Sequence, residues 1–285
     1  MNISLFGYTG FFGKEIYNFL KTKKKISSIS VFSSKEFNLS KKINLKALSK
    51  SYKKNCTIIF CSGIKKQYGD NLKIYDLNHN IITNFAKSLN KKVRRIIYFS
   101  SASVYGEDIP HKRKIDENSK LFLKSYYGLN KYTSEKILEK VSKELGIKLL
   151  ILRLPLVYGV GDTTKGYGPS DFINCYINNK AISLWGKGDE LREFIYIKDI
   201  VKITYKLLNS KSEGIFNIVS GRSYTFFSII KILNKIFSKS HKIIYKKRTK
   251  QKVDHKFNNK KFSKLLKGYK FYSLEKGIKS FLKNL

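Results

Sequence analysis

The chain has 285 residues, an apolar fraction of 42% and a net charge of +38, which comes from 58 Lys and Arg against 20 Asp and Glu. This length can bury a large core as one big domain or two smaller ones. No run of about 18 apolar residues argues for a transmembrane helix, and the first residues lack the basic region and cleavage site of a signal peptide. The three cysteines have no metal spacing and fit free thiols, so we expect a cytoplasmic protein without a metal site.

The positive charge is spread over the whole chain and is densest between residues 242 and 264. One interpretation is a nucleic-acid or membrane-surface partner. We favour compositional bias, because Lys, Asn and Ile are abundant throughout, and we therefore expect no specific nucleic-acid or membrane partner. In either case the field would attract an anionic substrate such as a nucleotide diphosphate.

The beginning of the chain predicts a dinucleotide site. Residues 2–6 are typical of a buried strand, a helix follows to about residue 20, and a Gly-x-x-Gly-x-x-Gly turn joins them. Such glycines allow the backbone to approach a pyrophosphate that sits on the helix N-terminus. The spacing differs from the commoner Gly-x-Gly-x-x-Gly, and a plain strand–helix turn is the alternative. The candidate cofactor residues here are Gly7, Thr9, Gly10, Phe11, Phe12 and Gly13.

The second expected strand, residues 28–32, bears on the type of dinucleotide. An acid that binds the ribose would normally end this strand, but Ser33, Ser34 and Lys35 follow it and the first acid is Glu36. Hydroxyls and a lysine would suit a 2′-phosphate, so NAD and NADP both stay open, with an ordinary polar loop as the alternative. Further candidate cofactor residues are Asn38 and Leu39 at the adenine end and Cys61, Ser62 and Gly63 at the end of the expected strand 57–61.

A serine-rich segment, residues 100–106, follows the expected strand 93–99. Ligands of open parallel sheets bind outside the carboxyl ends of the strands. Ser101 or Ser103 is therefore placed to hydrogen-bond a reacting hydroxyl or carbonyl. A serine-rich turn without a ligand is the alternative.

The expected helix 125–145 carries Tyr127 and Lys131, which are one helical turn apart and so project from the same face. A phenol with an ordinary pKa of about 10 is a poor base at neutral pH. A nearby ammonium favours the phenolate and lowers that pKa, which would make the pair a proton-transfer device. The spacing alone is weak, since Tyr132 and Lys136 share it; the serine-rich segment upstream favours Tyr127.

Alternating strands and helices predict an α/β fold with a parallel sheet. We expect a Rossmann-type domain over residues 1–158, whose core strands continue to about residue 220, and a smaller, discontinuous substrate-binding part over 159–285. The other expected elements are helices at 45–51, 77–89, 171–179, 199–208 (capped by Asp199), 225–237, 260–266 and 273–282, strands at 148–154, 181–184, 215–219 and 243–245, and a loop at 159–172.

Taken together, these segments resemble the extended short-chain dehydrogenase/reductase family, specifically its NAD-dependent epimerase/dehydratase group acting on nucleotide sugars. The resemblance covers nearly the whole chain. It rests on the glycine turn 7–13, the Ser-Ser-x-x-Val-Tyr-Gly segment 100–106, the pair Tyr127 and Lys131 with Glu135 after it, segment 153–159, and the Arg-Glu-Phe-Ile-Tyr-Ile-Lys-Asp segment 192–199.

The resemblance implies roles for individual residues. Ser101, Tyr127 and Lys131 would be catalytic, and Tyr127 and Lys131 would also contact the nicotinamide cofactor. Arg192 would bind the substrate diphosphate. The remaining cofactor residues would be Asn80, Ser100, Pro155 and Val157, and the remaining substrate residues Ser103 and Leu156. The resemblance also implies a homodimer with a four-helix contact that includes helix 125–145.

Some positions depart from the family pattern. Leu156 stands where many members have an Asn that contacts the substrate diphosphate, Asn130 replaces a Ser, and Glu193 replaces an Asp. Ala102 and Ser103 stand where sugar 4,6-dehydratases carry an Asp-Glu pair, which supplies the acid and base for elimination of water. Dehydratase activity is therefore disfavoured.

We therefore predict an NAD(P)-dependent nucleotide-sugar epimerase that acts at C4 by hydride transfer. An NADPH-dependent 4-keto nucleotide-sugar reductase is the alternative within enzymes. A non-catalytic cofactor sensor or RNA-binding protein on the same fold is the alternative from another class.

Overall fold

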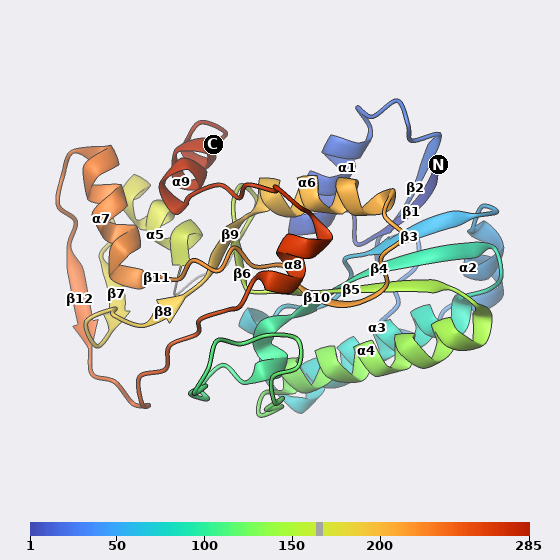
Figure 1. Ribbon diagram of the computed structural model, residues 1–285, viewed down its shortest axis with the longest axis horizontal. Coiled ribbons are helices and arrows are strands. Elements are labelled where there is room, and N and C mark those ends of the chain that lie inside the picture. Colours follow the sequence, from blue (N-terminus) through green and yellow to red (C-terminus); the bar gives the residue numbers. More distant parts are fainter. Residues whose placement is uncertain (164–167) are drawn as a thin grey trace. The chain divides into compact units, whose positions relative to one another are not determined.

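The computed structural model describes residues 1–163 and 168–285 (Figure 1), so part of the expected loop 159–172 lies outside the described residues. The chain divides into two compact units, each built from discontinuous stretches. The first consists of Met1–Gly106, Leu121–Arg153 and Val201–Phe216, and the second of Glu107–Lys120, Leu154–Ile200 and Asn217–Leu285. The expected division at residue 158 stays a prediction.

The first unit is built on a six-stranded sheet with the strand order β10-β5-β4-β3-β1-β2. Strand β1 pairs in parallel with both β2 and β3, and β3 pairs in parallel with β4. The strand bounds are β1 Asn2–Phe6, β2 Ser28–Phe32, β3 Cys56–Phe60, β4 Val93–Ser101, β5 Lys148–Leu154 and β10 Gly214–Asn217. The order reverses at β1, because β2 lies on one side of it and β3 on the other.

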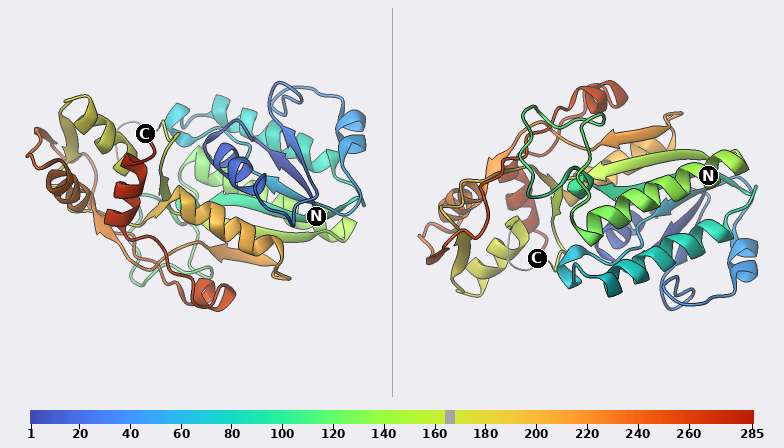
Figure 2. Two further views of the ribbon diagram at one scale, coloured as in Figure 1. Left: turned by 90° about the horizontal axis from the view of Figure 1, so that it is seen from above. Right: turned by 90° about the horizontal axis from the view of Figure 1, so that it is seen from below.

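Helices cover both faces of this sheet (Figures 1 and 2). On one face lie α1 (Phe11–Leu20) and α6 (Ile197–Leu208), which meet through the rings of Phe19 and Tyr205 with centroids 5.6 Å apart. On the other face lie α3 (Leu72–Ser88) and α4 (Tyr126–Leu145), with α2 (Leu45–Ser51) beside α3. This doubly wound arrangement confirms the predicted fold class.

The covered faces explain the apolar runs of the sequence. All five residues of β3 are buried, and so are the last four of β1. A strand buried on both faces has no polar side to present to water, so it reads as a continuous hydrophobic run. Phe6 packs in this core against Phe32 and Phe60, with ring centroids 4.6 and 5.6 Å away.

In its described residues, the second unit has three short strand pairs and several helices. Its strands are β6 (Leu156–Tyr158) parallel to β9 (Phe194–Tyr196), β7 (Ile182–Trp185) parallel to β12 (Ile243–Lys246), and β8 (Leu191–Arg192) antiparallel to β11 (Tyr224–Thr225). Its helices are α5 (Gly168–Ile177), α7 (Phe226–Phe237), α8 (Lys260–Leu265) and α9 (Leu274–Leu282). Among the described residues of the first unit, short 3-10 turns are η1 (Lys66–Tyr68) and η2 (Ala102–Tyr105).

Three helix starts differ by two or more residues from the sequence-based expectation: those of α3, α6 and α5, which begins at Gly168 and not at residue 171. Helix α3 begins at Leu72, five residues early, because the Asn71 side chain caps it by accepting from the Ile74 amide. Helix α6 begins at Ile197, so Asp199 lies in its first turn and is not its cap. The Asp199 carboxylate instead accepts hydrogen bonds from the Tyr269 hydroxyl and the Tyr272 amide. Within the described ranges, no helix has the length and apolar character needed to cross a bilayer.

Candidate active site

The glycine turn lies at the point where the strand order reverses, which is where ligands of such sheets bind. Gly7 adopts a left-handed φ of +74°, and a Cβ on it would come within 2.9 Å of the Ser62 amide nitrogen. A Cβ on Gly13 would lie only 2.1 Å from the Gly7 carbonyl oxygen. Both positions therefore require glycine, and the β1 turn, the β3 end and the start of α1 are in close contact.

Helix α1 begins directly after this turn at Phe11. Its N-cap is Gly10, and no side chain caps the first amides. Free N–H groups at a helix N-terminus, together with the helix dipole, favour an anion. Lys65 adds positive charge, since its ammonium lies 4.9 Å from the centre of the Phe11 ring. The turn thus fits the pyrophosphate of a dinucleotide, and Thr9 and Gly10 are exposed beside it.

Glu36 lies four residues beyond the last residue of β2, but its side chain reaches back to the end of that strand. Glu36 folds back, and its carboxylate accepts from the Ser33 hydroxyl and, at 2.8 Å, from the Ser33 amide. The Ser33 hydroxyl accepts in turn from the Lys35 amide at 3.1 Å. These bonds from Ser33 lower the pKa of Glu36, so a carboxylate stands at the strand end. The Ser-x-x-Glu spacing of a capping box was the sequence signal for this contact.

Two expected adenine-side residues are used within the protein. Leu39 is 5% exposed and belongs to the hydrophobic core, so its side chain faces the interior. The Asn38 side chain accepts from the amide and hydroxyl of Ser40, which closes a local turn.

Asn80 was expected at the cofactor, but Asn78 is the residue of α3 that faces the glycine-rich side. The Asn78 side chain accepts from the Ile64 amide at 2.7 Å and donates to the Ile64 carbonyl at 3.1 Å. A Cβ on Gly63 would lie 3.6 Å from the Asn78 oxygen. Asn80, two residues on and therefore on another face of the helix, reaches the Ser40 carbonyl instead.

Lys131 connects three parts of the candidate site. Its ammonium donates to the Phe99 carbonyl at 2.9 Å, lies 5.7 Å from the centre of the Tyr127 ring, and would be 3.9 Å from a Cβ on Gly63. Burial lowers the pKa of Lys131 to about 8, while Glu135 acts in the opposite direction. Burial raises the pKa of Cys61, which keeps this thiol neutral.

The serine segment ends β4 at the same edge of the sheet. The Ser101 hydroxyl accepts from the Ser103 amide at 3.1 Å and lies 3.0 Å from the Ser103 hydroxyl. Helix α4 begins beside this segment, because a Cβ on Gly128 would come within 2.8 Å of the Ser103 carbonyl. The half-buried Tyr127 has its amide fixed by Asp70 at 3.0 Å. Ser100 differs from its neighbours, since it is buried and its hydroxyl donates to Glu135.

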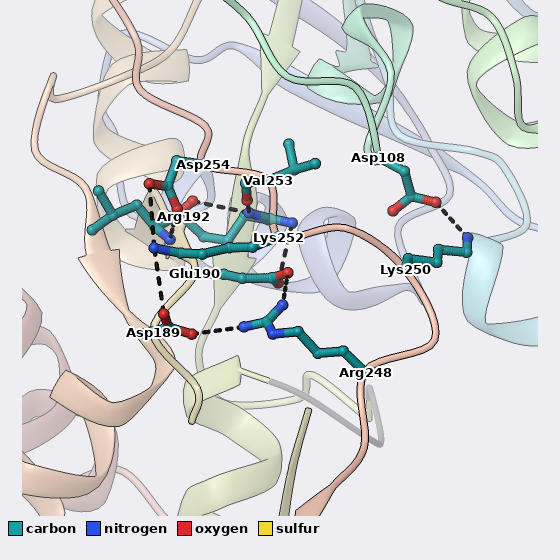
Figure 3. Close-up of polar contacts among 10 residues, drawn as sticks. Asp108, Asp189, Glu190, Arg192, Arg248, Lys250, Lys252, Val253 and Asp254 are labelled. Carbon is teal, nitrogen blue, oxygen red and sulfur yellow. Dashed lines mark hydrogen bonds and ion pairs between the residues drawn. The ribbon is translucent and has the colours of Figure 1, made fainter. Parts of the chain in front are cut away.

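Four of the expected residues belong to the second unit. Pro155 precedes β6, and Leu156 and Val157 lie in that strand, paired with Phe194 and Ile195. Arg192 ends β8 and is engaged within its own unit, as Figure 3 shows.

The contacts of Arg192 form part of a charged network (Figure 3). Its guanidinium donates to the Val253 carbonyl and lies 3.5 Å from Glu190. Arg248 also pairs with Glu190 and lies 2.7 Å from Asp189, which in turn is 3.4 Å from the Lys252 ammonium. No local sequence pattern predicts this network, because its two halves are about 60 positions apart.

The chain belongs to the NAD dependent epimerase/dehydratase family, whose sequence profile matches residues 3–219. This confirms the resemblance to extended short-chain dehydrogenases/reductases. A putative UDP-glucose 4-epimerase of Methanocaldococcus jannaschii is 34% identical over an alignment of 167 residues, and the match covers 55% of this chain and 54% of the relative. A dTDP-4-dehydro-6-deoxyglucose reductase of Escherichia coli is also 34% identical, over 55% of this chain and 51% of the relative. The chain thus aligns with about half the length of these curated relatives.

Solved structures show the same fold over the full length. UDP-glucuronic acid 4-epimerase from Bacillus cereus, in complex with UDP-glucuronic acid and NAD, superposes with a TM-score of 0.82 at 19% identity, covering 99% of this chain and 98% of that one. UDP-N-acetylglucosamine 4-epimerase from Methanobrevibacter ruminantium, in complex with UDP-N-acetylmuramic acid, gives a TM-score of 0.81, also at 19% identity, over 100% of this chain and 99% of that one.

Proposed function

We propose that this chain is an NAD(P)-dependent nucleotide-sugar epimerase acting at C4, with Tyr127 as proton-transfer group and Ser101 and Lys131 beside it. The observation that carries the proposal is the position of Lys131. Its ammonium lies next to the strand end that bears Ser101, the ring of Tyr127 and the backbone of Gly63. The family membership and the 4-epimerases among the relatives support the same reaction.

The residues of the turn fit a dinucleotide. Gly7 and Gly13 keep the backbone free of side chains, and the open N-terminus of α1 offers amides to a pyrophosphate. When bound, the nicotinamide accepts and returns a hydride. Glu36 at the end of β2 suits a ribose hydroxyl better than a 2′-phosphate, because two adjacent anions repel. We therefore propose NAD as the preferred cofactor.

In the proposed reaction the protein moves a proton and orients the sugar. The Tyr127 phenolate takes the proton of the C4 hydroxyl, Lys131 stabilises the phenolate by its charge, and the Ser101 hydroxyl holds the same oxygen. A carbonyl remains at C4 after the hydride has left. The protein then lets the keto sugar turn and donates the proton back from Tyr127 when hydride returns to the other face.

A reductase is the second candidate, favoured by the Escherichia coli relative named as a keto-sugar reductase. A reductase releases its cofactor after one transfer, whereas an epimerase regenerates it. Mass spectrometry of nucleotide released from the purified protein distinguishes the two: tightly held NAD supports the epimerase, and rapid exchange of NADPH supports the reductase.

We also propose a homodimer with α4 at its interface. The molecular mass measured by light scattering tests this proposal.

The test of the function compares two tyrosines of the same helix. Purified protein is incubated with a panel of UDP-, dTDP- and GDP-sugars, and interconversion at C4 is followed by NMR. Tyr127→Phe should lower turnover by about 100-fold or more. Tyr132→Phe is the matched control, because Tyr132 also lies one turn before a lysine, with the Lys136 ammonium 5.4 Å from its ring. Retention of more than about a tenth of turnover by Tyr127→Phe would contradict the assignment.

A further inference from the structure

A buried polar cluster lies directly behind the candidate catalytic residues. Glu135 is 0% exposed and receives a two-point contact from Arg153, with Nε to Oε1 at 3.0 Å and Nη2 to Oε2 at 2.6 Å. The Ser100 hydroxyl donates to the same carboxylate, and Arg153 Nη1 donates to the Tyr105 hydroxyl at 2.9 Å. Four buried side chains from α4, β4, η2 and β5 thus share one set of hydrogen bonds.

Stability alone does not explain this cluster. Taking two charges out of water costs several kcal/mol per ion, and well-packed apolar residues of similar volume often replace a buried ion pair without loss of stability. A fully satisfied, bidentate pair does fix the direction of the groups that it joins. The cluster is therefore best explained by the geometry that it holds.

The cluster fixes both ends of the segment that carries Ser101. On α4, Tyr127, Lys131 and Glu135 follow one another at intervals of four residues and so share a face. Lys131 holds the Phe99 carbonyl, and Glu135 holds the hydroxyl of Ser100, the residue before Ser101.

At the far end of the same segment, η2 closes with Tyr105, whose hydroxyl is held by Arg153. The Ser101–Val104 stretch is therefore clamped between two anchors that meet at Glu135. All of these residues lie in the first unit.

We propose that Glu135, through Ser100 and Arg153, is a positioning residue that fixes the Ser101 segment against the proton-transfer pair Tyr127 and Lys131. This inference rests on the proposed function for its catalytic consequence. Glu135 does not touch the substrate in this role. A displacement of about 1 Å of a reacting group can lower a rate by about 100-fold, so the clamp should act on turnover and not on substrate binding.

The decisive variants remove the clamp without leaving a buried charge alone. In Glu135→Leu/Arg153→Met both charges are lost and the volume is roughly kept, so no buried charge is left unpaired. The buried hydroxyls of Ser100 and Tyr105 lose these partners, so the protein should fold with a melting temperature a few degrees below that of the wild type. We expect kcat to fall by about 100-fold while KM for the nucleotide sugar changes by less than about threefold. Glu139→Gln is the control: it also removes a carboxylate from α4, but at an exposed position paired with Lys136 at 2.8 Å, and it should leave kcat unchanged.

A second variant tests the same clamp in case the double variant does not fold. Tyr105→Phe removes one hydroxyl and leaves the Glu135–Arg153 pair intact. It should lower kcat by about tenfold, less than the double variant, because only the Tyr105 anchor of the Ser101 segment is lost. Full kcat in either folded variant would overturn the proposal.

The outcome is separable from the fate of the proposed function. If wild-type protein turns over no nucleotide sugar, the function fails, and hydrogen exchange by mass spectrometry still tests the clamp. The peptide covering residues 99–106 should exchange faster in Glu135→Leu/Arg153→Met, or in Tyr105→Phe, and not in Glu139→Gln. Unchanged protection of this peptide would sink the inference whether or not the enzyme is active. A wild-type enzyme that loses activity in Tyr127→Phe but keeps it in the clamp variants would retain the function and refute the clamp.

Discussion

The lowered pKa of Lys131 leads to a specific dependence of activity on pH. With a pKa of about 8, the ammonium is about 90% populated at pH 7 and about 10% at pH 9. The Tyr127 phenolate needs that charge beside it, so turnover should fall about tenfold between pH 7 and pH 9. Lys131→Met should lower turnover at pH 7 by about 100-fold and remove this alkaline decline.

Thermal unfolding of the same pair of proteins tests the pKa without any substrate. In the unfolded chain the lysine pKa returns to about 10.4, so between about pH 8 and pH 10 the unfolded state binds more protons than the folded state. Stability of the wild type relative to Lys131→Met should therefore rise with pH in this window, by at most about 1.4 kcal/mol per pH unit. The cause is that the folded protein must bury a charged amine below about pH 8, whereas it buries a neutral amine at higher pH.

The control is Lys136→Met, at an exposed lysine of the same helix, which should leave the alkaline decline in place. An alkaline decline that persists at the same midpoint in Lys131→Met would contradict the role assigned to the Lys131 ammonium. A stability difference between wild type and Lys131→Met that stays flat from pH 8 to pH 10 would contradict its lowered pKa.

Three further predictions concern other residues. Glu36→Gln should raise the ratio of NADP to NAD affinity about tenfold, because it removes the carboxylate at the end of β2; an unchanged ratio in cofactor titrations would place Glu36 outside the ribose site. Gly13→Ala should lower the free energy of unfolding by about 1–3 kcal/mol in urea, since its Cβ collides with the Gly7 carbonyl, and stability equal to wild type would contradict the close approach. Burial raises the pKa of Glu193 to about 7, so between about pH 4.5 and pH 7 the folded state binds more protons than the unfolded state. The wild type should therefore lose stability as pH rises through this window. The melting temperature of Glu193→Gln, measured against that of the wild type at each pH, should increase over the same range.

The sequence by itself predicted the parts of the site that depend on local order. Gly7 to Gly13 follows a short apolar strand, and the four-residue spacing of Tyr127 and Lys131 places both on one face of a helix whatever surrounds it. The alternation of strands and helices also predicted the doubly wound sheet, because parallel strands need crossover helices. These features arise from contacts within a few residues of the chain.

Only the tertiary structure shows which of two similar residues faces the candidate site. Asn78 and Asn80 are equivalent in sequence, but only the packing of α3 turns Asn78 to the Ile64 backbone. Leu39, expected at a ligand, was the residue needed to fill the core. The rotation of a helix about its own axis depends on the neighbouring surface against which the helix packs. That surface forms only when distant parts of the chain come together.

Long-range polar contacts were also decided only by the folded structure. The pairs Glu135 with Arg153 and Arg192 with Val253 are 18 and 61 positions apart. Charged groups at such separations meet only when the strands and helices between them have fixed their ends in space. For this protein, local spacing determined which chemical groups are present, and the packing of β4, β5 and α4 determined that a buried carboxylate holds them in place.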